Sequence, residues 1–295
     1  MPCSLFIHSF TTFLRLQTCK KLIAFSRFLV FLLKEGAMKI LVLLKEVPVV
    51  SEIRINRQYL TIDRSGVGKM MNPADRHAIE AALVLANARG GEVTAITMGP
   101  ESSDSILREA VSLGVKSAYR LTDKAFAGAD TLATAAILKA AIDATGPYDA
   151  IFCGASSIDG VTGQIPAKLG TMLGYGILTN ACKIEIGDEG MTIDRKAGTG
   201  YEKLTAAFPL VCSVTEDANT PRKPSIKGRT ASKRLVVEVM DNEKLQIPAE
   251  SLKSPSKVIG LFPPPALEKG QMIPAEDPEA AVAELVELLQ EQAAF

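Results

Sequence analysis

Small and polar residues gather at four places where an apolar run ends and a turn or helix begins. These places are Asn72 to Asp75, Thr97 to Pro100, Gly128 to Thr134, and Cys153 to Gln164. The first turn of a helix presents unpaired N–H groups and the positive end of the helix dipole, and both attract phosphate. Glycines such as Gly160 and Gly163 let the backbone approach a phosphate closely. This chemistry indicates a phosphate-containing ligand such as a nucleotide.

Side chains at these turns add hydrogen-bonding groups. The donors are Thr131, Thr134, Thr162 and Gln164. Asp130 could accept a hydrogen bond from a ribose hydroxyl or an adenine amine. The alternative is that each Asp, Thr or Asn only caps its own helix. Four such turns at one sheet edge favour a nucleotide site, but their spacing does not distinguish AMP, ATP and FAD.

The apolar pattern predicts four strands that alternate with four helices. Strands are expected at 39–44, 92–98, 117–121 and 149–153, and helices at about 72–90, 102–113, 130–144 and 163–173. This order is typical of an α/β fold with a doubly wound, Rossmann-like parallel sheet. Right-handed crossovers place the carboxyl ends of all the strands at one edge, so the four turns should meet there.

The rest of the body follows other patterns. A small hairpin is expected at 53–62, and strand-like segments recur at 182–186, 191–194, 204–207 and 210–214. Residues 236–295 read as an extended, Pro-rich arm that ends in an amphipathic helix. Such an arm packs on a partner or folds back on its own chain. We therefore expect a nucleotide-binding domain over 38–235 and an arm with a terminal helix over 236–295.

A basic loop is predicted at 219–233, with two Pro, one Gly and five Lys or Arg. Ile226 is an apolar side chain between basic neighbours that include Arg222 and Lys227. One interpretation is a docking loop, in which Ile226 is the anchor and the surrounding charge steers an acidic partner. The other is a solvated loop with Ile226 turned inward.

Residues 1–37 differ from the rest of the chain. They hold six of the 11 Phe, and five basic residues against Glu35 alone. Lys34, Glu35 and Gly36 can be encoded by a purine-rich ribosome-binding sequence just before Met38. We expect translation to begin at Met38, with a targeting peptide as the alternative. The longest uncharged run, Met1 to Leu14, is shorter than the roughly 20 residues that span a bilayer, so membrane insertion is not expected.

The composition excludes several classes of site. Lys+Arg and Asp+Glu are both 33, so a general nucleic-acid-binding surface is not indicated. Two His and five Cys without a C-x-x-C pair argue against a His-rich metal centre and a four-thiolate cluster. His77 is expected to be structural. Scattered cysteines in odd number suggest a reducing compartment, hence a cytoplasmic location.

Familiar catalytic and nucleotide signatures are also missing. No G-x-G-x-x-G follows the first expected strand, and no G-x-S-x-G elbow is present. Gly66 to Lys69 lacks the spacing and the Ser or Thr of a P-loop. An ATP-pyrophosphatase would need a Ser-Gly-Gly-x-Asp-Ser loop after the first strand, where this chain has Leu44 to Val47.

Several motifs together resemble the β subunit of electron transfer flavoproteins, from Met38 to the C-terminus. They are Val42 to Pro48, Met71 to Asp75, Thr97 to Pro100, Ala129 to Thr134, Gly154 with Ile158 to Gly160, Thr162 to Gln164, and Asn219-x-Pro-Arg222. The resemblance implies an adenine-nucleotide-binding α/β domain, and an α subunit that carries the electron-transferring FAD. It also implies that Ile226 is the apolar anchor of a loop that docks acyl-CoA dehydrogenases.

The resemblance also implies a nucleotide site in this subunit. The matching positions are Leu43, Asn72, Pro73, Ala74, Asp75, Met98, Asp159, Gly160, Val161, Thr162, Gly163, Gln164, Ile165, Pro166 and Ala167. Simple carriers of the family hold AMP there. Electron-bifurcating members hold a second FAD that takes hydride from NADH.

The turn formed by Asp130, Thr131, Ala133 and Thr134 looks like the flavin-binding subclass, so FAD is expected, with AMP as the alternative. One departure counts against that assignment, because Val161 stands where bifurcating members have an acidic residue. The chain also departs from the family's acidic signature, with Gly198 to Gly200 where one or two acidic residues are usual, although Glu202 is kept. From another class, the alternative is a non-redox, stress-type adenine-nucleotide-binding protein, which predicts a stable homodimer without flavin.

Overall fold

A computed structural model describes residues 37–49, 54–56, 61–63, 68–256, 259, 270, 272–274 and 276–291. The expected extension at 1–37 therefore lies outside the described residues, apart from Ala37, and so does most of the Pro-rich segment between 257 and 275. The chain divides into two units. The larger comprises residues up to 54 and 63–258, and the smaller comprises 55–62 and 259–295.

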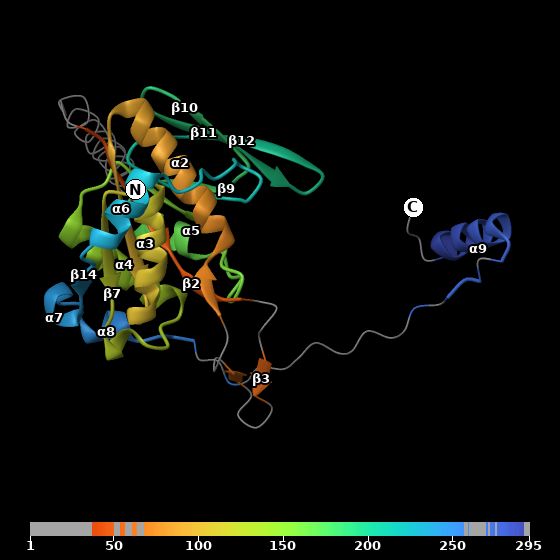
Figure 1. The fold of residues 1–295 in the computed structure, drawn as a ribbon, viewed down its shortest axis with the longest axis horizontal. Helices are drawn as coiled ribbons and strands as arrows, with labels where there is room; N and C mark the ends of the chain where they lie inside the picture. Colours follow the sequence, from red (N-terminus) through yellow and green to blue (C-terminus); the bar gives the residue numbers. More distant parts are fainter. Residues whose placement is uncertain are drawn as a thin grey trace, which may run out of the picture. The chain divides into compact units, whose positions relative to one another are not determined.

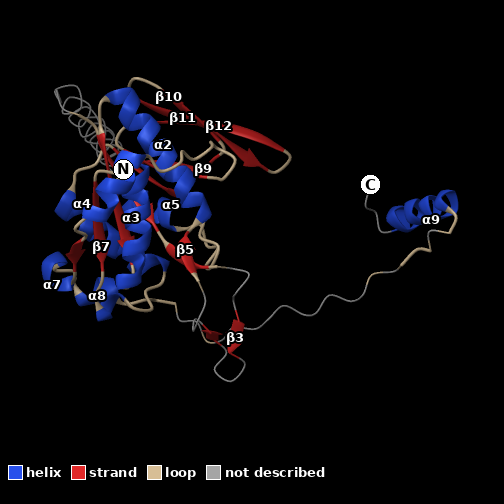
Figure 2. Ribbon diagram, viewed as in Figure 1, coloured by secondary structure: helices blue, strands red, loops and turns tan. Residues whose placement is uncertain are grey.

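The larger unit is built on a seven-stranded sheet in the order β14-β7-β6-β1-β8-β13-β9 (Figures 1 and 2). Every neighbouring pair in it is parallel. The strands are β1 (Lys39–Leu44), β6 (Glu92–Met98), β7 (Ser117–Leu121), β8 (Ala150–Gly154), β9 (Gly176–Ala181), β13 (Leu210–Val214) and β14 (Glu238–Met240). Apolar runs form the central strands because both faces of the sheet are covered.

Helices cover both faces, and each face has its own apolar core. Helices α2 (Pro73–Arg89) and α3 (Asp104–Leu113) pack on one face, where Ile79 and Leu107 are buried. Helices α4 (Thr131–Thr145) and α5 (Ile165–Leu173) pack on the other, where Ile137 and Leu169 are buried. The α/β, doubly wound parallel sheet predicted from the sequence is confirmed.

Two small antiparallel sheets belong to the same unit. Strands β10 (Lys183–Ile186), β11 (Gly190–Ala197) and β12 (Gly200–Ala207) form one, as the strand-like segments after residue 181 predicted. Strands β2 (Glu46–Pro48) and β5 (Lys69–Met71) form the other. The parallel strand β9 was not predicted. A short 3₁₀ turn, Glu101–Ser103, precedes α3, and another, Lys124–Phe126, precedes α4.

The structure corrects two details of the predicted organisation. Part of the loop expected at 219–233 is helix α6 (Ile226–Arg234), capped by the Ser225 side chain, which accepts from the Gly228 N–H. Residues after 236 do not leave the body at once. They form β14 on the edge of the main sheet, then α7 (Asn242–Leu245) and α8 (Ala249–Leu252), whose Leu245 and Leu252 pack on the α4 face.

The smaller unit contains most of β3 (Arg54–Asn56) and β4 (Thr61–Asp63), and helix α9 (Pro278–Glu291). β3 and β4 pair as a two-stranded sheet, which agrees with the hairpin expected at 53–62. Helix α9 confirms the predicted terminal helix, and Val282, Leu285 and Val286 on it are exposed. None of the described helices combines the length and apolar character that a membrane crossing requires.

Candidate functional site

The strand order reverses direction between β1 and β8. Chain that follows β1 builds the sheet toward β6 and β7, whereas chain that follows β8 builds it toward β13 and β9. Open α/β sheets bind ligands in the crevice outside the carboxyl ends of the strands at such a switch point. Lys45 follows β1 there, and Gly154 ends β8.

Asp75, in the first turn of α2, ties the ends of these two strands together. Its carboxylate accepts hydrogen bonds from the Lys45 N–H at 2.7 Å and the Gly154 N–H at 3.0 Å. The Asn72 side-chain amide donates to it at 3.0 Å. Burial raises the pKa of Asp75 to about 6, although all three donors favour the charged form. Asp75 is therefore a structural clamp between the ends of β1 and β8.

Asn72 and Lys45 extend this clamp to the loop after β8. The Asn72 side chain donates to the Ser156 carbonyl at 2.9 Å and accepts from the Ile158 N–H at 3.2 Å. Lys45 Nζ lies 2.7 Å from Asp159 Oδ1, and the same ammonium donates to Ser157 Oγ at 3.2 Å. Residues 72–75 and 156–159, which the sequence analysis named separately, thus form one connected group.

The loop that follows is exposed to solvent, and the Val161 N–H donates back to the Ser157 carbonyl at 2.8 Å. Residues 160–164 are all exposed, and Val161 and Gly163 have left-handed backbones, with φ of 53° and 59°. Helix α5 begins after Gln164 without a side-chain cap, and Pro166 occupies its first turn. The first N–H groups of a helix have no partner within it. This arrangement fits a phosphate group, which would accept from these N–H groups.

The start of α4 faces the same loop. Thr131 Oγ donates to Gln164 Oε1 at 2.8 Å and accepts from Lys168 Nζ at 2.5 Å. Asp130 caps α4 by accepting from the Leu132 and Ala133 N–H groups, each at 3.0 Å. Its other carboxylate oxygen accepts from Ser256, so Asp130 is engaged within the chain. The capping alternative considered for Asp130 therefore describes its local geometry.

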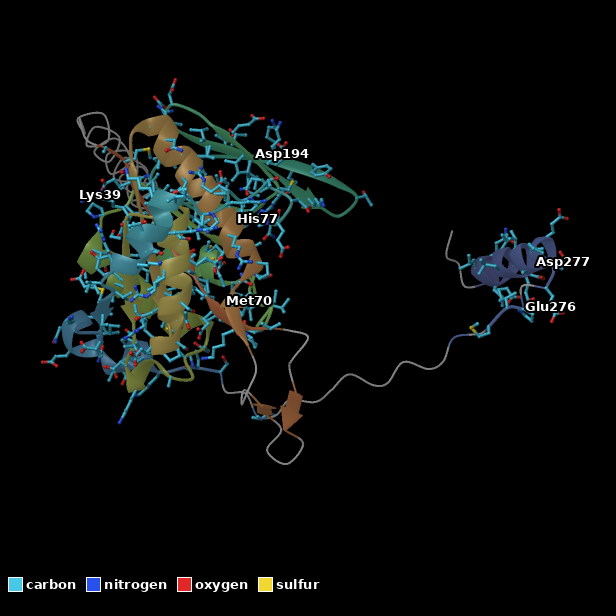
Figure 3. All side chains as sticks on the ribbon, in the orientation of Figure 1. Lys39, Met70, His77, Asp194, Glu276 and Asp277 are labelled. Atoms are coloured by element: carbon cyan, nitrogen blue, oxygen red, sulfur yellow. The ribbon has the colours of Figure 1, made fainter. Side chains whose placement is uncertain are left out.

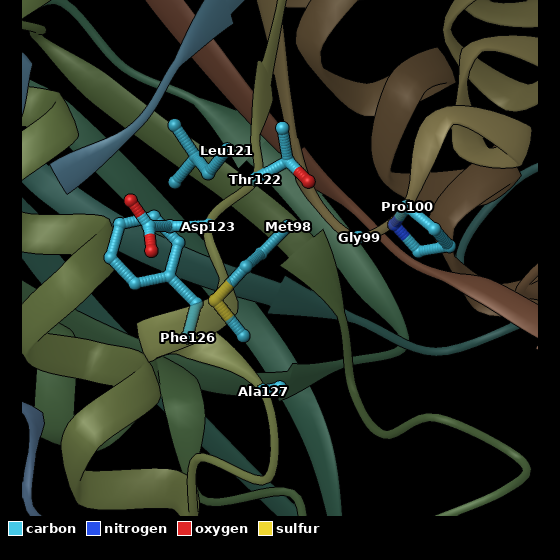
Figure 4. Close-up of a pocket in the computed structure, with 8 residues that line it drawn as sticks. All are labelled: Met98, Gly99, Pro100, Leu121, Thr122, Asp123, Phe126 and Ala127. Carbon is cyan, nitrogen blue, oxygen red and sulfur yellow. The ribbon is translucent and has the colours of Figure 1, made fainter.

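A cavity of about 250 Å³ lies at the carboxyl ends of β6 and β7 (Figure 4). It is lined by Met98, Gly99, Pro100, Leu121, Thr122, Asp123, Phe126 and Ala127. Met98 is the expected site residue among these. Leu43 is buried in the core on the α4 face of the sheet, and Ala133 is buried in the first turn of α4. Ala167 is exposed in the first turn of α5.

Lys45 and Ser157 were missed by the sequence reasoning. Their only signal in the sequence is position, since Lys45 comes directly after the first strand and Ser157 lies in the Gly-rich turn after β8.

Three other side chains that could do chemistry lie within the body of the larger unit. His77, labelled on α2 in Figure 3, lies with Nδ1 2.9 Å from the Asn219 carbonyl oxygen. Cys153 and Cys212 are free and buried, and burial raises the pKa of Cys212 to about 12.

The three residues expected to dock a partner, Arg222, Ile226 and Lys227, have different surroundings in the structure. Ile226 begins α6 and is 87% exposed, which excludes the inward-turned alternative, and Lys227 beside it is exposed. Arg222 instead makes a two-pronged ion pair with Glu80 of α2, with N–O distances of 2.7 and 2.9 Å. Arg222 thus anchors the segment, while Ile226 and Lys227 remain open to a partner.

Comparison with known proteins identifies the family of the chain. The electron transfer flavoprotein domain matches residues 59–245. A relative from Thermoanaerobacterium thermosaccharolyticum, electron transfer flavoprotein subunit beta, is 38% identical over 85% of this chain and 98% of its own. The caffeyl-CoA reductase-Etf complex subunit CarD of Acetobacterium woodii is 34% identical over 86% and 99%. Protein FixA of Bradyrhizobium diazoefficiens is 35% identical over 85% and 91%. The chain belongs to the electron transfer flavoprotein family, among its β subunits.

Proposed function

We propose that this β subunit binds an adenine nucleotide at the switch point between β1 and β8. The observation that carries the proposal is the exposed loop 160–164, which leads into the uncapped start of α5. Phosphate would take hydrogen bonds from this backbone. Lys45 adds a positive charge next to Asp159, just before the loop, and Lys168 adds one in α5, where it donates to Thr131. Asn72 and Asp75 contribute by fixing the loop rather than by charge.

We infer that the nucleotide is FAD, with AMP as the alternative at the same site. The turn from Ala129 to Thr134 supports FAD by its resemblance to the flavin-binding subclass. The cavity beside Met98 supports it by offering space at the carboxyl ends of β6 and β7, and β6 is the neighbour of β1 in the sheet. A bound flavin would supply the redox chemistry, while the protein sets its position and exposure. No side chain is required as acid, base or nucleophile.

The proposed partners follow from the family and from the exposed surfaces. As a β subunit, the chain pairs with an electron transfer flavoprotein α subunit, and the exposed face of α9 is proposed to pack on it. Ile226 and Lys227 are proposed to dock an acyl-CoA dehydrogenase-type partner. If FAD occupies the β site, NADH is the proposed electron donor, with the electrons divided by flavin-based bifurcation. The free cysteines support a cytoplasmic location.

The test is a nucleotide extraction from the αβ complex, separated chromatographically and counted per heterodimer. Two FAD without AMP would support a flavin in this subunit and NADH-driven bifurcation. One FAD and one AMP would mean a simple carrier, and the resemblance at Asp130 would have been over-interpreted. One FAD and no second nucleotide would overturn the proposed site.

A variant locates the nucleotide within the complex. Lys45→Met should remove the positive charge and the tie to Asp159, and so lower the occupancy of the second nucleotide without changing the first. Lys183→Met is the matched control, because Lys183 makes a similar ion pair with Glu185 on the exposed β10 strand. Equal occupancy in both variants would argue against a site beside Lys45.

A further inference from the structure

A cluster of hydrogen bonds joins the start of α4 to chain more than 120 residues away. Asp130 Oδ2 accepts from the Ser256 N–H at 3.2 Å and from Ser256 Oγ at 2.8 Å. In return, the Asp130 N–H donates to Ser254 Oγ at 2.9 Å, and Ser254 Oγ donates to the Gly128 carbonyl at 3.4 Å. Each side of the contact therefore both donates and accepts.

The contact lies where the chain leaves the larger unit. The boundary between the two units falls between Val258 and Ile259, only a few residues after Ser256. Pro255 and Ser256 are exposed, and Leu252 of α8 is the last partly buried apolar side chain before them. Hydrogen bonds to Asp130, rather than apolar burial, therefore hold residues 254–256 on the body.

The next residue connects this contact to the proposed nucleotide loop. Thr131 bonds to Gln164 and Lys168, at the loop 160–164 and the first turns of α5. Asp130 and Thr131 are adjacent at the start of one helix, and the Asp130 carboxylate is oriented by the first-turn N–H groups of that helix. Ordering of the loop would therefore restrain the same helical turn that holds Ser256.

We propose that Asp130 is a latch for the root of the C-terminal segment, and that Thr131 couples this latch to occupancy of the nucleotide loop. The coupling rests on the proposed function, whereas the latch does not. A nucleotide that orders residues 160–164 holds Gln164 against Thr131, which steadies the first turn of α4 and the Asp130 carboxylate. Residues 254–256 are then released from the start of α4 less often when the site is filled.

The test uses hydrogen–deuterium exchange of the intact αβ complex, stripped of the β-site nucleotide and then reloaded with FAD or with AMP. The Asp130→Ser variant keeps a good helix cap but cannot reach Ser256. We expect exchange of the Ser256 N–H, which donates to the Asp130 carboxylate, to rise at least tenfold in this variant. Ser232→Ala is the control, since the Ser232 hydroxyl bonds only within α6, to Arg229 O. Unchanged exchange in Asp130→Ser would overturn the latch.

The coupling has its own variant and readout. In the wild-type complex, we expect the nucleotide to slow exchange of the Ser256 N–H severalfold. At equal nucleotide occupancy, Thr131→Val should abolish this slowing, because it removes the hydroxyl that bonds to Gln164 and Lys168. Occupancy is measured in the same samples. A filled site with no slowing in the wild type would overturn the coupling while sparing the proposed function. Failure of FAD and AMP to bind would overturn the proposed function and the coupling together, and the Asp130→Ser result would still decide the latch.

Discussion

Asp75 Oδ2 lies 2.7 Å from the Lys45 backbone nitrogen, so a side chain of helix α2 accepts a hydrogen bond from the N–H of the residue that follows β1. The other oxygen of the same carboxylate accepts from the N–H of Gly154, the last residue of β8. The two strands on either side of the switch point are thereby held in one relative position. Two strand ends that are already fixed cost less ordering when a ligand binds than two loose ones.

The buried Asp75 should give the protein a specific pH dependence. Burial raises its folded pKa from 3.8 to about 6, so the native state binds a proton that the unfolded state does not bind between these values. Stability contributed by this group therefore rises as the pH falls from 7 to 5, by about 1 kcal/mol. We expect the free energy of unfolding of the wild type, minus that of Asp75→Asn, to increase by this amount over that range.

Urea unfolding of both proteins at pH 7 and pH 5 measures the difference. The subtraction removes the contributions of carboxylates that both proteins share. A difference that stays constant, or that decreases at pH 5, would show that Asp75 is not a high-pKa carboxylate.

Gly154 should tolerate no side chain. A Cβ there would lie 2.4 Å from Asp75 Oδ1, 2.9 Å from Ala74 Cβ and 3.0 Å from Asn72 Nδ2. Gly154→Ala would have to displace the clamp, at a cost of roughly 1–3 kcal/mol of stability. We also expect lower nucleotide occupancy, because loop 156–159 depends on Asn72. Gly200→Ala is the matched control, because a Cβ at Gly200 meets nothing within 4 Å. Thermal unfolding and nucleotide content of the two variants test the prediction, and equal behaviour would contradict it.

Apolar periodicity sufficed to predict the strands β1, β6, β7 and β8 and the helices that cover them, because both depend on local patterns with a known period. The order of these elements also predicted that the turns at 72–75 and 153–164 share an edge, since right-handed crossovers bring the carboxyl ends of parallel strands together. The partners of individual side chains were not predictable. Ser256 is 126 positions from Asp130, and nothing local to either residue marks the other. Lys45 and Asp159 meet for the same reason, through topology rather than through spacing.

The errors have local causes as well. Residues 226–234 contain a glycine and several basic residues, and two prolines lie just before them, which favoured a loop. The Ser225 cap and the contact with α3 outweigh this low helix preference, because Arg108 donates to the Ser232 and Leu235 carbonyls at 3.0 and 3.1 Å. Strand β14 has only three residues, too few to establish an alternating pattern. Its existence depends on the open edge of β7.

Ile226→Asp should slow electron delivery to the dehydrogenase-type partner and leave the nucleotide content unchanged. The side chain is 87% exposed, so the free energy of unfolding should change by less than about 0.5 kcal/mol. Val236→Asp is the control, because Val236 is 88% exposed and lies outside α6. Stopped-flow measurement of partner reduction compares the two variants. Equal slowing would indicate a general effect of negative charge rather than an anchor at Ile226.

The Glu80–Arg222 ion pair should stabilise the segment before α6 at neutral pH and lose this effect at acidic pH. Its hydrogen bond with Arg222 lowers the pKa of Glu80 below the ordinary 4.5. A carboxylate with a depressed folded pKa contributes stability that is complete above the unfolded pKa and is lost as the pH falls through the folded pKa. We expect Glu80→Gln to cost on the order of 1 kcal/mol at pH 7, since the pair is bidentate but partly exposed, and progressively less below pH 4. Glu92→Gln is the control, because Glu92 and Lys116 are 3.8 Å apart and both well exposed. Urea unfolding at pH 7 and pH 3.5 checks both, and an equal loss in the two variants at pH 7 would mean that Arg222 anchors nothing.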